Sequence, residues 1–152
     1  MIRATSVIRA AGRRGTASDS VTLSFDDRHR RRLALQGDRG LEFLLDLPEA
    51  TALRNGDGLT LEDGRVVEVL EKPEPLLVVK AADQRQLARL AWHIGNRHVP
   101  AAIEGDRILI RQDHVIAGML VGLGARLSSV EAPFNPESGA YAAHRHGGHD
   151  HG

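Results

Sequence analysis

Four histidines lie close together near the C-terminal end of the 152-residue chain: His144, His146, His149 and His151. Arginine, glycine and aspartate separate them. Neutral imidazole is a suitable ligand for Ni²⁺, Zn²⁺ and Cu²⁺, and a histidine-rich tract with glycines can wrap its side chains around one ion. The chain has no cysteine, so any metal site must use nitrogen and oxygen ligands. A purification tag or a passive solubilising tail remains an alternative, although an engineered tag is normally an unbroken histidine run.

Two further histidines stand where a predicted helix ends or begins. His98 lies just beyond the first predicted helix, in a loop position where residues are exposed and often functional. A lone histidine there suits a C-terminal helix cap equally well, because a cation favours that end of the helix dipole. His114 follows Asp113, which is expected to cap the second helix. The positive end of that dipole favours neutral imidazole, the form that binds metal.

The first half of the chain is expected to be all-β. From Thr5 to about Leu70, short apolar runs are broken by turn residues, with little sign of the helical period. The Asp63-Gly64 pair between two such runs predicts a hairpin. Prolines 73 and 75 then interrupt the pattern, because proline removes a backbone donor and restricts the residue before it. Residues 1–73 are therefore assigned to a β domain.

The second half predicts an α+β arrangement. A strand over 76–81 is followed by a helix capped by Asp83, a hairpin across Gly105-Asp106, a helix capped by Asp113 and a last strand over 126–132. The two helices carry apolar stripes at helical spacing: Leu87, Leu90, Ala91 and Ile94, then Ile116, Met119, Leu120 and Leu123. This order of elements is the split βαβ of a ferredoxin-like domain, assigned to residues 74–134. From Pro133 onward no periodic apolar residues remain to be buried, and residues 135–152 are expected to form a disordered His-rich tail.

Composition and missing motifs exclude several classes of function. Twenty basic residues balance twenty acidic ones and only 3% of residues are aromatic, which argues against nucleic acid as a partner. The basic cluster Arg28–Arg32 is expected to be a solvated face. No uncharged apolar stretch approaches the ~20 residues of a membrane span, and arginines interrupt any signal-like segment near Met1, so we expect a cytoplasmic protein without a membrane role. No phosphate-binding loop, zinc-protease motif or nucleophile elbow is present, and no enzyme activity is predicted.

Several motifs together point to a known family. They are Gly95-Asn96-Arg97-His98-Val99-Pro100, Asp113-His114-Val115, Pro133-Phe134, Gly139-Ala140-Tyr141 and the histidine tail. This combination spans the whole chain and resembles the UreE family, urease accessory nickel carriers. The resemblance implies an N-terminal β domain similar to the peptide-binding domain of a heat-shock co-chaperone, followed by a ferredoxin-like metal-binding domain.

The resemblance also implies a metal site. His98 would lie at a homodimer interface where two symmetry-related copies share one Ni²⁺, and tail histidines such as His144 or His146 would fill the remaining positions. Some members carry a histidine two positions before that of Asp-His-Val. Here that position is Gln112, which argues against a second internal site at Gln112 and His114.

The resulting hypothesis is a nickel metallochaperone that delivers Ni²⁺ for assembly of the urease active site, with urease apoprotein and its accessory GTPase complex as partners. Two alternatives remain open. One is a non-enzymatic peptide-binding scaffold whose histidines are incidental. The other is a Zn²⁺ or Cu²⁺ buffer or sensor that uses the tail, because the same nitrogen ligands bind Cu²⁺ more tightly than Ni²⁺.

Overall fold

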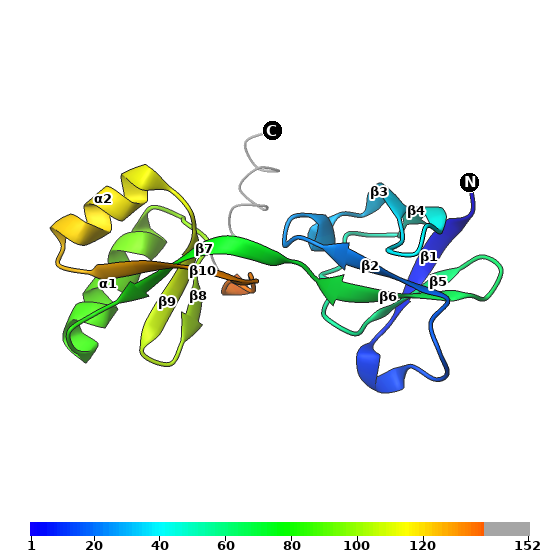
Figure 1. Ribbon diagram of the computed structural model, residues 1–152, viewed down its shortest axis with the longest axis horizontal. Helices are drawn as coiled ribbons and strands as arrows, with labels where there is room; N and C mark the ends of the chain where they lie inside the picture. The colour runs from blue at the N-terminus through cyan, green and yellow to red at the C-terminus, as the bar shows by residue number, and fades with distance from the viewer. Residues whose placement is uncertain (139–152) are drawn as a thin grey trace. The chain divides into compact units, whose positions relative to one another are not determined.

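The computed structural model describes residues 1–138, which are divided between two compact units with the boundary between Lys72 and Pro73. Within these residues the chain forms two sheets and two α-helices, so the class is mixed α+β (Figure 1). The sheet of the first unit and the sheet of the second unit each pack against a separate hydrophobic core.

The first unit is a six-stranded sheet with short 3₁₀ turns, which confirms the all-β prediction for this half. Its strands run in the order β2-β6-β5-β1-β4-β3. Val21 and Leu23 are buried whereas Thr22 between them is exposed, as expected for a half-buried strand. Asp63-Gly64 makes the predicted hairpin, with Gly64 at φ 91°. The elements are β1 (Arg3–Ile8), η1 (Ala10–Gly12), β2 (Asp19–Leu23), η2 (Asp27–His29), β3 (Arg32–Gln36), β4 (Glu42–Asp46), β5 (Gly58–Leu61) and β6 (Val66–Glu71).

A buried carboxylate holds the loop between β3 and β4. Asp19 accepts backbone N–H hydrogen bonds from Ser20 at 2.7 Å, Arg39 at 2.9 Å and Leu41 at 3.1 Å. Burial raises the pKa of the Asp19 carboxyl, but the amide hydrogen bonds and the Arg39 charge outweigh it and lower the pKa overall. The loop therefore closes around a carboxylate that stays ionised.

The predicted solvated face at Arg28–Arg32 is wrong for its first residue. Arg28 is 1% exposed, and its Nη1 lies 3.2 Å from a Glu71 carboxylate oxygen. Its guanidinium also lies 6.0 Å from the centroid of the Phe25 ring. Arg30, Arg31 and Arg32 are exposed as predicted. A buried guanidinium needs such a partner, because an unpaired charge in the core is strongly destabilising.

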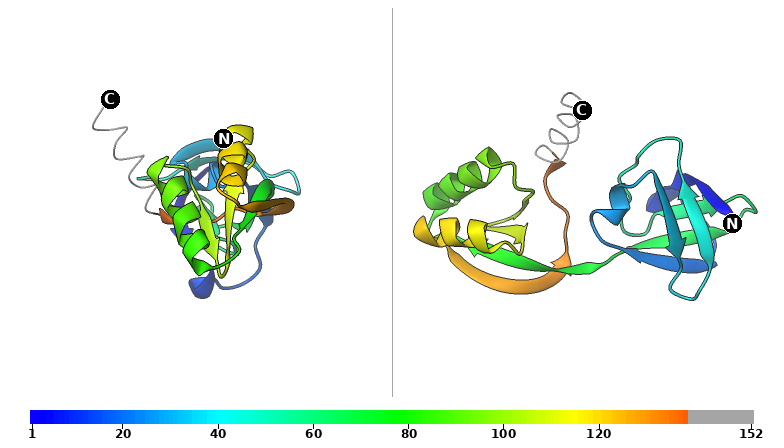
Figure 2. Two further views of the ribbon diagram at one scale, coloured as in Figure 1. Left: turned by 90° about the vertical axis from the view of Figure 1, so that its left-hand side faces the viewer. Right: turned by 90° about the horizontal axis from the view of Figure 1, so that it is seen from above.

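The second unit has the predicted order strand, helix, strand, strand, helix, strand. Its four strands are antiparallel and lie in the order β10-β7-β9-β8, with both helices on one face of the sheet (Figure 2). The core between helices and sheet includes Leu90 and Ile94 from the first helix and Ile116 and Leu120 from the second. The elements are β7 (Pro73–Lys80), α1 (Gln84–Asn96), β8 (Ala102–Glu104), β9 (Arg107–Arg111), α2 (His114–Gly122) and β10 (Arg126–Pro133).

Two features at the ends of this unit differ from expectation. β7 begins earlier than the strand expected over 76–81: Pro73 and Pro75 belong to it, where the chain runs beyond β9 and pairs only with β10. Proline is tolerated there because this stretch of β7 has a neighbouring strand on one side only. Pro133 is the last residue of β10, and Phe134 after it is fully buried with its ring 5.3 Å from the Arg111 guanidinium. The Glu137 N–H donates to Ala101 O at 2.7 Å, so packed structure extends past the predicted start of the tail.

Within residues 1–138, neither helix has the length and apolar character needed to cross a membrane.

Candidate metal centre

Helix α1 positions the candidate ligand His98 at its C-terminal end. Asp83 Oδ1 accepts from the Gln86 N–H at 2.8 Å and caps the first turn, while Gln86 Oε1 accepts from the Ala82 N–H at 2.6 Å. Leu90 and Ile94 are buried against the sheet, as the apolar stripe predicts. Since the helix is fixed at its start and along its inner face, the position where it ends is fixed too.

The chain leaves α1 through a left-handed turn centred on His98. The His98 N–H donates to Gly95 O at 3.0 Å and the Val99 N–H donates to Ile94 O at 3.3 Å. These two bonds, together with the packing of Val99 in the same core as Ile94, make a Schellman motif. Its left-handed position is normally glycine. Here it is His98, with φ 58°, the one non-glycine residue at positive φ in the part of the chain that is described.

His98 is thus an exposed imidazole held in an unfavourable backbone conformation. A left-handed backbone costs an L-residue roughly 1–2 kcal/mol, and such strain is typical of functional sites. The His98 ring makes no hydrogen bond within residues 1–138. Such a ring can coordinate a metal ion through either nitrogen once it is deprotonated.

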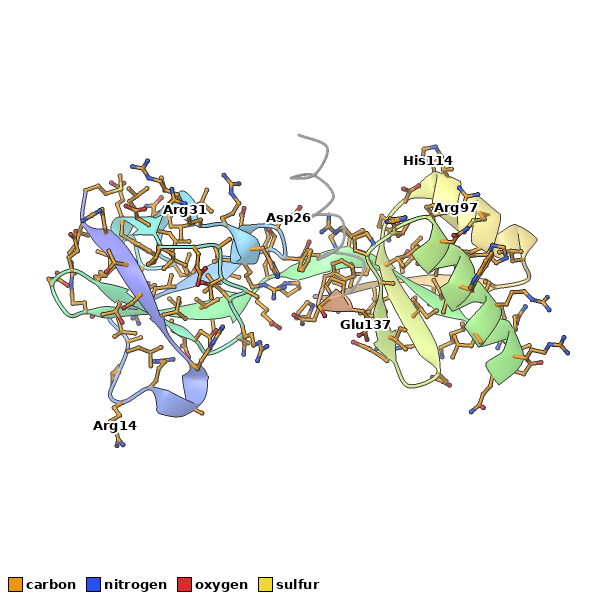
Figure 3. All side chains as sticks on the ribbon, turned by 180° about the vertical axis from the view of Figure 1, so that it is seen from behind. Arg14, Asp26, Arg31, Arg97, His114 and Glu137 are labelled. Carbon is orange, nitrogen blue, oxygen red and sulfur yellow. The ribbon has the colours of Figure 1, made fainter. Side chains whose placement is uncertain are left out.

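His114 begins α2 at the same end of the helical layer. Figure 3 labels Arg97, the residue before His98, and His114, and both lie at this end of the two helices. His114 is exposed, and the Asp113 carboxylate before it caps the helix by accepting from the Val115 N–H at 2.9 Å and the Ile116 N–H at 3.1 Å. The predicted cap is therefore confirmed. Asp113 Oδ1 is occupied by these two amides, whereas the predicted ligand His114 is exposed.

No complete metal site exists within residues 1–138: nowhere there do three histidine or carboxylate side chains gather closely enough to hold an ion. The side chain of Gln112 is engaged in another contact, because its Nε2 donates to Leu76 O at 3.2 Å. The predicted tail ligands His144, His146, His149 and His151 lie outside the described residues.

The outer face of α2 is apolar, and no other part of residues 1–138 covers it. Val115 is 63% exposed and Val121 58% exposed, and no charged residue occurs between His114 and Gly122. Gly118 and Gly122 lie on the same face with open space beside their Cα atoms. Glycine inside a helix costs roughly 0.5–1 kcal/mol, and one use of it is close approach of another backbone. This face was not predicted, because the apolar stripe used to predict α2 contains only the residues that point inward.

Comparison with known proteins follows the same division of the chain. A family model described as the UreE urease accessory protein, C-terminal domain, matches residues 74–152, and one for the N-terminal domain matches residues 4–70. The chain belongs to the UreE family. The resemblance drawn from the sequence motifs is thereby confirmed.

Individual UreE proteins are similar over nearly the whole chain. The urease accessory protein UreE of Bradyrhizobium sp. (strain ORS 278) is 60% identical over 149 residues, which cover 97% of this chain and 71% of the relative. UreE of Chelativorans sp. (strain BNC1) is 60% identical over 151 residues, covering 99% and 94%. UreE of Rhodobacter capsulatus is 53% identical over 152 residues, covering 100% and 94%.

Proposed function

We propose that this chain is a cytoplasmic, non-enzymatic nickel metallochaperone that works as a homodimer. In this proposal the His98 side chains of two copies share one Ni²⁺, and the tail histidines His144, His146, His149 and His151 complete its coordination. The cargo is delivered to urease apoprotein through its accessory GTPase complex. His114 is a secondary candidate ligand.

The observation that carries the proposal is the backbone of His98. Glycine would fit a left-handed C-terminal turn at less cost, so the imidazole at this position needs a reason other than folding. Membership of a urease accessory family makes metal transfer to urease the chemistry that best supplies that reason.

The uncovered α2 face supports the dimer. An apolar helical face exposed on a monomer usually marks an interaction site. In a two-fold dimer each ligand occurs twice, so one His98 per chain places two imidazoles on one ion. We also infer a ferredoxin-like class for this unit from its strand order, and a peptide-binding-like role for the β unit.

The proposed division of ligands between the folded units and the tail also allows the Ni²⁺ ion to be released. Two imidazoles from the folded units leave an octahedral ion with open positions, which the tail can fill. Ordering a tail costs roughly 1–2 kcal/mol per residue in backbone entropy, so its ligands add affinity without making the site irreversible.

Calorimetric Ni²⁺ titration tests the proposal on three proteins: the intact chain, His98→Ala and a chain ending at Tyr141. We expect His98→Ala to abolish the tightest step and the truncation to lower the stoichiometry or affinity, with the dimer mass unchanged. If His98→Ala binds like the intact chain, the shared site is wrong. Parallel titrations with Zn²⁺ and Cu²⁺ measure the selectivity of the site. A separate assay of urease activation at limiting nickel distinguishes a delivery factor from a general metal buffer.

A further inference from the structure

The outward stripe of α1 combines arginine with the chain's single tryptophan. Arg85, Arg89, Trp92 and Asn96 are spaced i, i+4, i+7 and i+11, and all four are exposed, opposite the buried Leu90 and Ile94. Trp92 is 64% exposed, and its ring meets the His93 ring edge-on at a centroid distance of 5.0 Å. We call these four residues the α1 stripe.

The charges on the α1 stripe are not neutralised locally. Helix α1 contains no acidic residue. Among residues 1–138, neither Arg85 nor Arg89 has a carboxylate within ion-pair distance. Asp83, the nearest acid in sequence, directs its Oδ1 at the Gln86 amide of the first turn. The stripe therefore presents two unpaired guanidinium groups along one side of an exposed indole.

We propose that the α1 stripe is a docking surface for an acidic surface of a partner protein. Trp and Arg are the residue types that most often dominate binding energy at protein interfaces, and carboxylates are the natural ligands of guanidinium groups. Leaving a tryptophan exposed forgoes the free energy of burying a large apolar side chain, and a partner that covers it can recover that energy.

A second copy of this chain is a poor occupant for the α1 stripe. In a two-fold contact the same patch meets itself, which would bring arginines against arginines. The apolar α2 face carries no such penalty and is the surface assigned above to the dimer. The α1 stripe remains outward for another protein, and this inference rests on the proposed delivery of nickel to urease.

Urease activation at limiting nickel, in cells that lack their own copy of this protein, tests the inference. The charge-reversed Arg85→Glu/Arg89→Glu double variant and Trp92→Ala are each expected to reduce activation at least tenfold. Arg85→Lys/Arg89→Lys keeps the positive charge and should retain most of it. The matched control Lys80→Glu/Arg126→Glu reverses two exposed positive charges at positions that are opposite each other on β7 and β10, and should retain full activity.

Three outcomes overturn the docking surface. Full activation by the charge-reversed variant excludes it, and full activation by Trp92→Ala excludes the indole as its anchor. Loss of dimer mass on Trp92→Ala would move the α1 stripe to the interface between copies. Each variant is also titrated with nickel. Reduced urease activation supports the docking surface only in a variant that binds nickel with the native stoichiometry. If the intact chain itself fails to raise urease activity, it is the proposed function that fails.

Discussion

Replacing His98 with glycine should remove the proposed ligand while leaving the fold at least as stable. His98 has φ 58°, a conformation that costs an L-residue roughly 1–2 kcal/mol and glycine almost nothing. Glycine also frees the unfolded chain, which offsets about 0.4–1 kcal/mol of that gain. His98→Ala removes the ligand but keeps the strain. We therefore expect the glycine variant to exceed the alanine variant by about 1 kcal/mol in free energy of unfolding.

Thermal unfolding followed by circular dichroism, with EDTA present, measures this difference without stabilisation by bound metal. About 1 kcal/mol corresponds to a melting temperature about 4–8 °C higher for a domain of 60–100 residues. Arg97 is the matched control, because its φ of −94° suits ordinary residues. There the glycine variant should melt below the alanine variant. The same order at both positions would refute the left-handed turn at His98 and the argument built on it.

Three further predictions concern the residues that hold each unit together. Asp113→Ala should lower the free energy of unfolding by about 1 kcal/mol, whereas Asp113→Asn should lower it much less. Chemical denaturation measures both values, and equal losses of unfolding free energy would contradict the cap. Gly37→Ala should destabilise the β unit by about 1–3 kcal/mol, because the new Cβ would overlap the Asp19 carboxylate. Gly12→Ala is the control, since a Cβ there meets no such group. Similar urea midpoints for the two variants would contradict this packing. The folded-state pKa of Asp19 lies below the ordinary 3.8, so its stabilisation is complete above about pH 5 and disappears as the pH falls through the lowered value. Asp19→Asn should flatten the loss of stability between pH 5 and pH 2 in urea titrations, and an unchanged acid slope would refute that role.

The helices were predictable because their signals are local. Asp83 and Asp113 cap the helices as expected, and the apolar stripe of α1 supplies the buried Leu90 and Ile94. The hairpin at Asp63-Gly64 depends on two adjacent residues in the same way. Each of these features is decided within a few residues, so the sequence contains the information in readable form.

Features that depend on distant partners were missed. Arg28 is buried because Glu71, more than forty residues away, neutralises it. Phe134 is a lone aromatic without periodic neighbours, yet it is fully buried. The prolines in β7 are tolerated only because β9 ends before reaching them, which depends on strand register. None of these facts is visible in a short window of sequence.

The candidate site likewise has one part that was predictable from local sequence and one part that was not. His98 was identifiable from its motif, but its left-handed backbone was not, since no glycine marks the turn. Its role as a shared ligand and the roles of the tail histidines remain predictions.

Native mass spectrometry of the nickel-loaded protein tests the central claim most directly, because it counts ions and chains in the same particle. We predict one tightly held Ni²⁺ for every two chains in the intact protein. The His98→Gly variant should show two chains without that ion under the same conditions. A tightly held ion on each single chain, or an unchanged ion count in the His98→Gly dimer, would contradict a nickel site shared between two copies of His98.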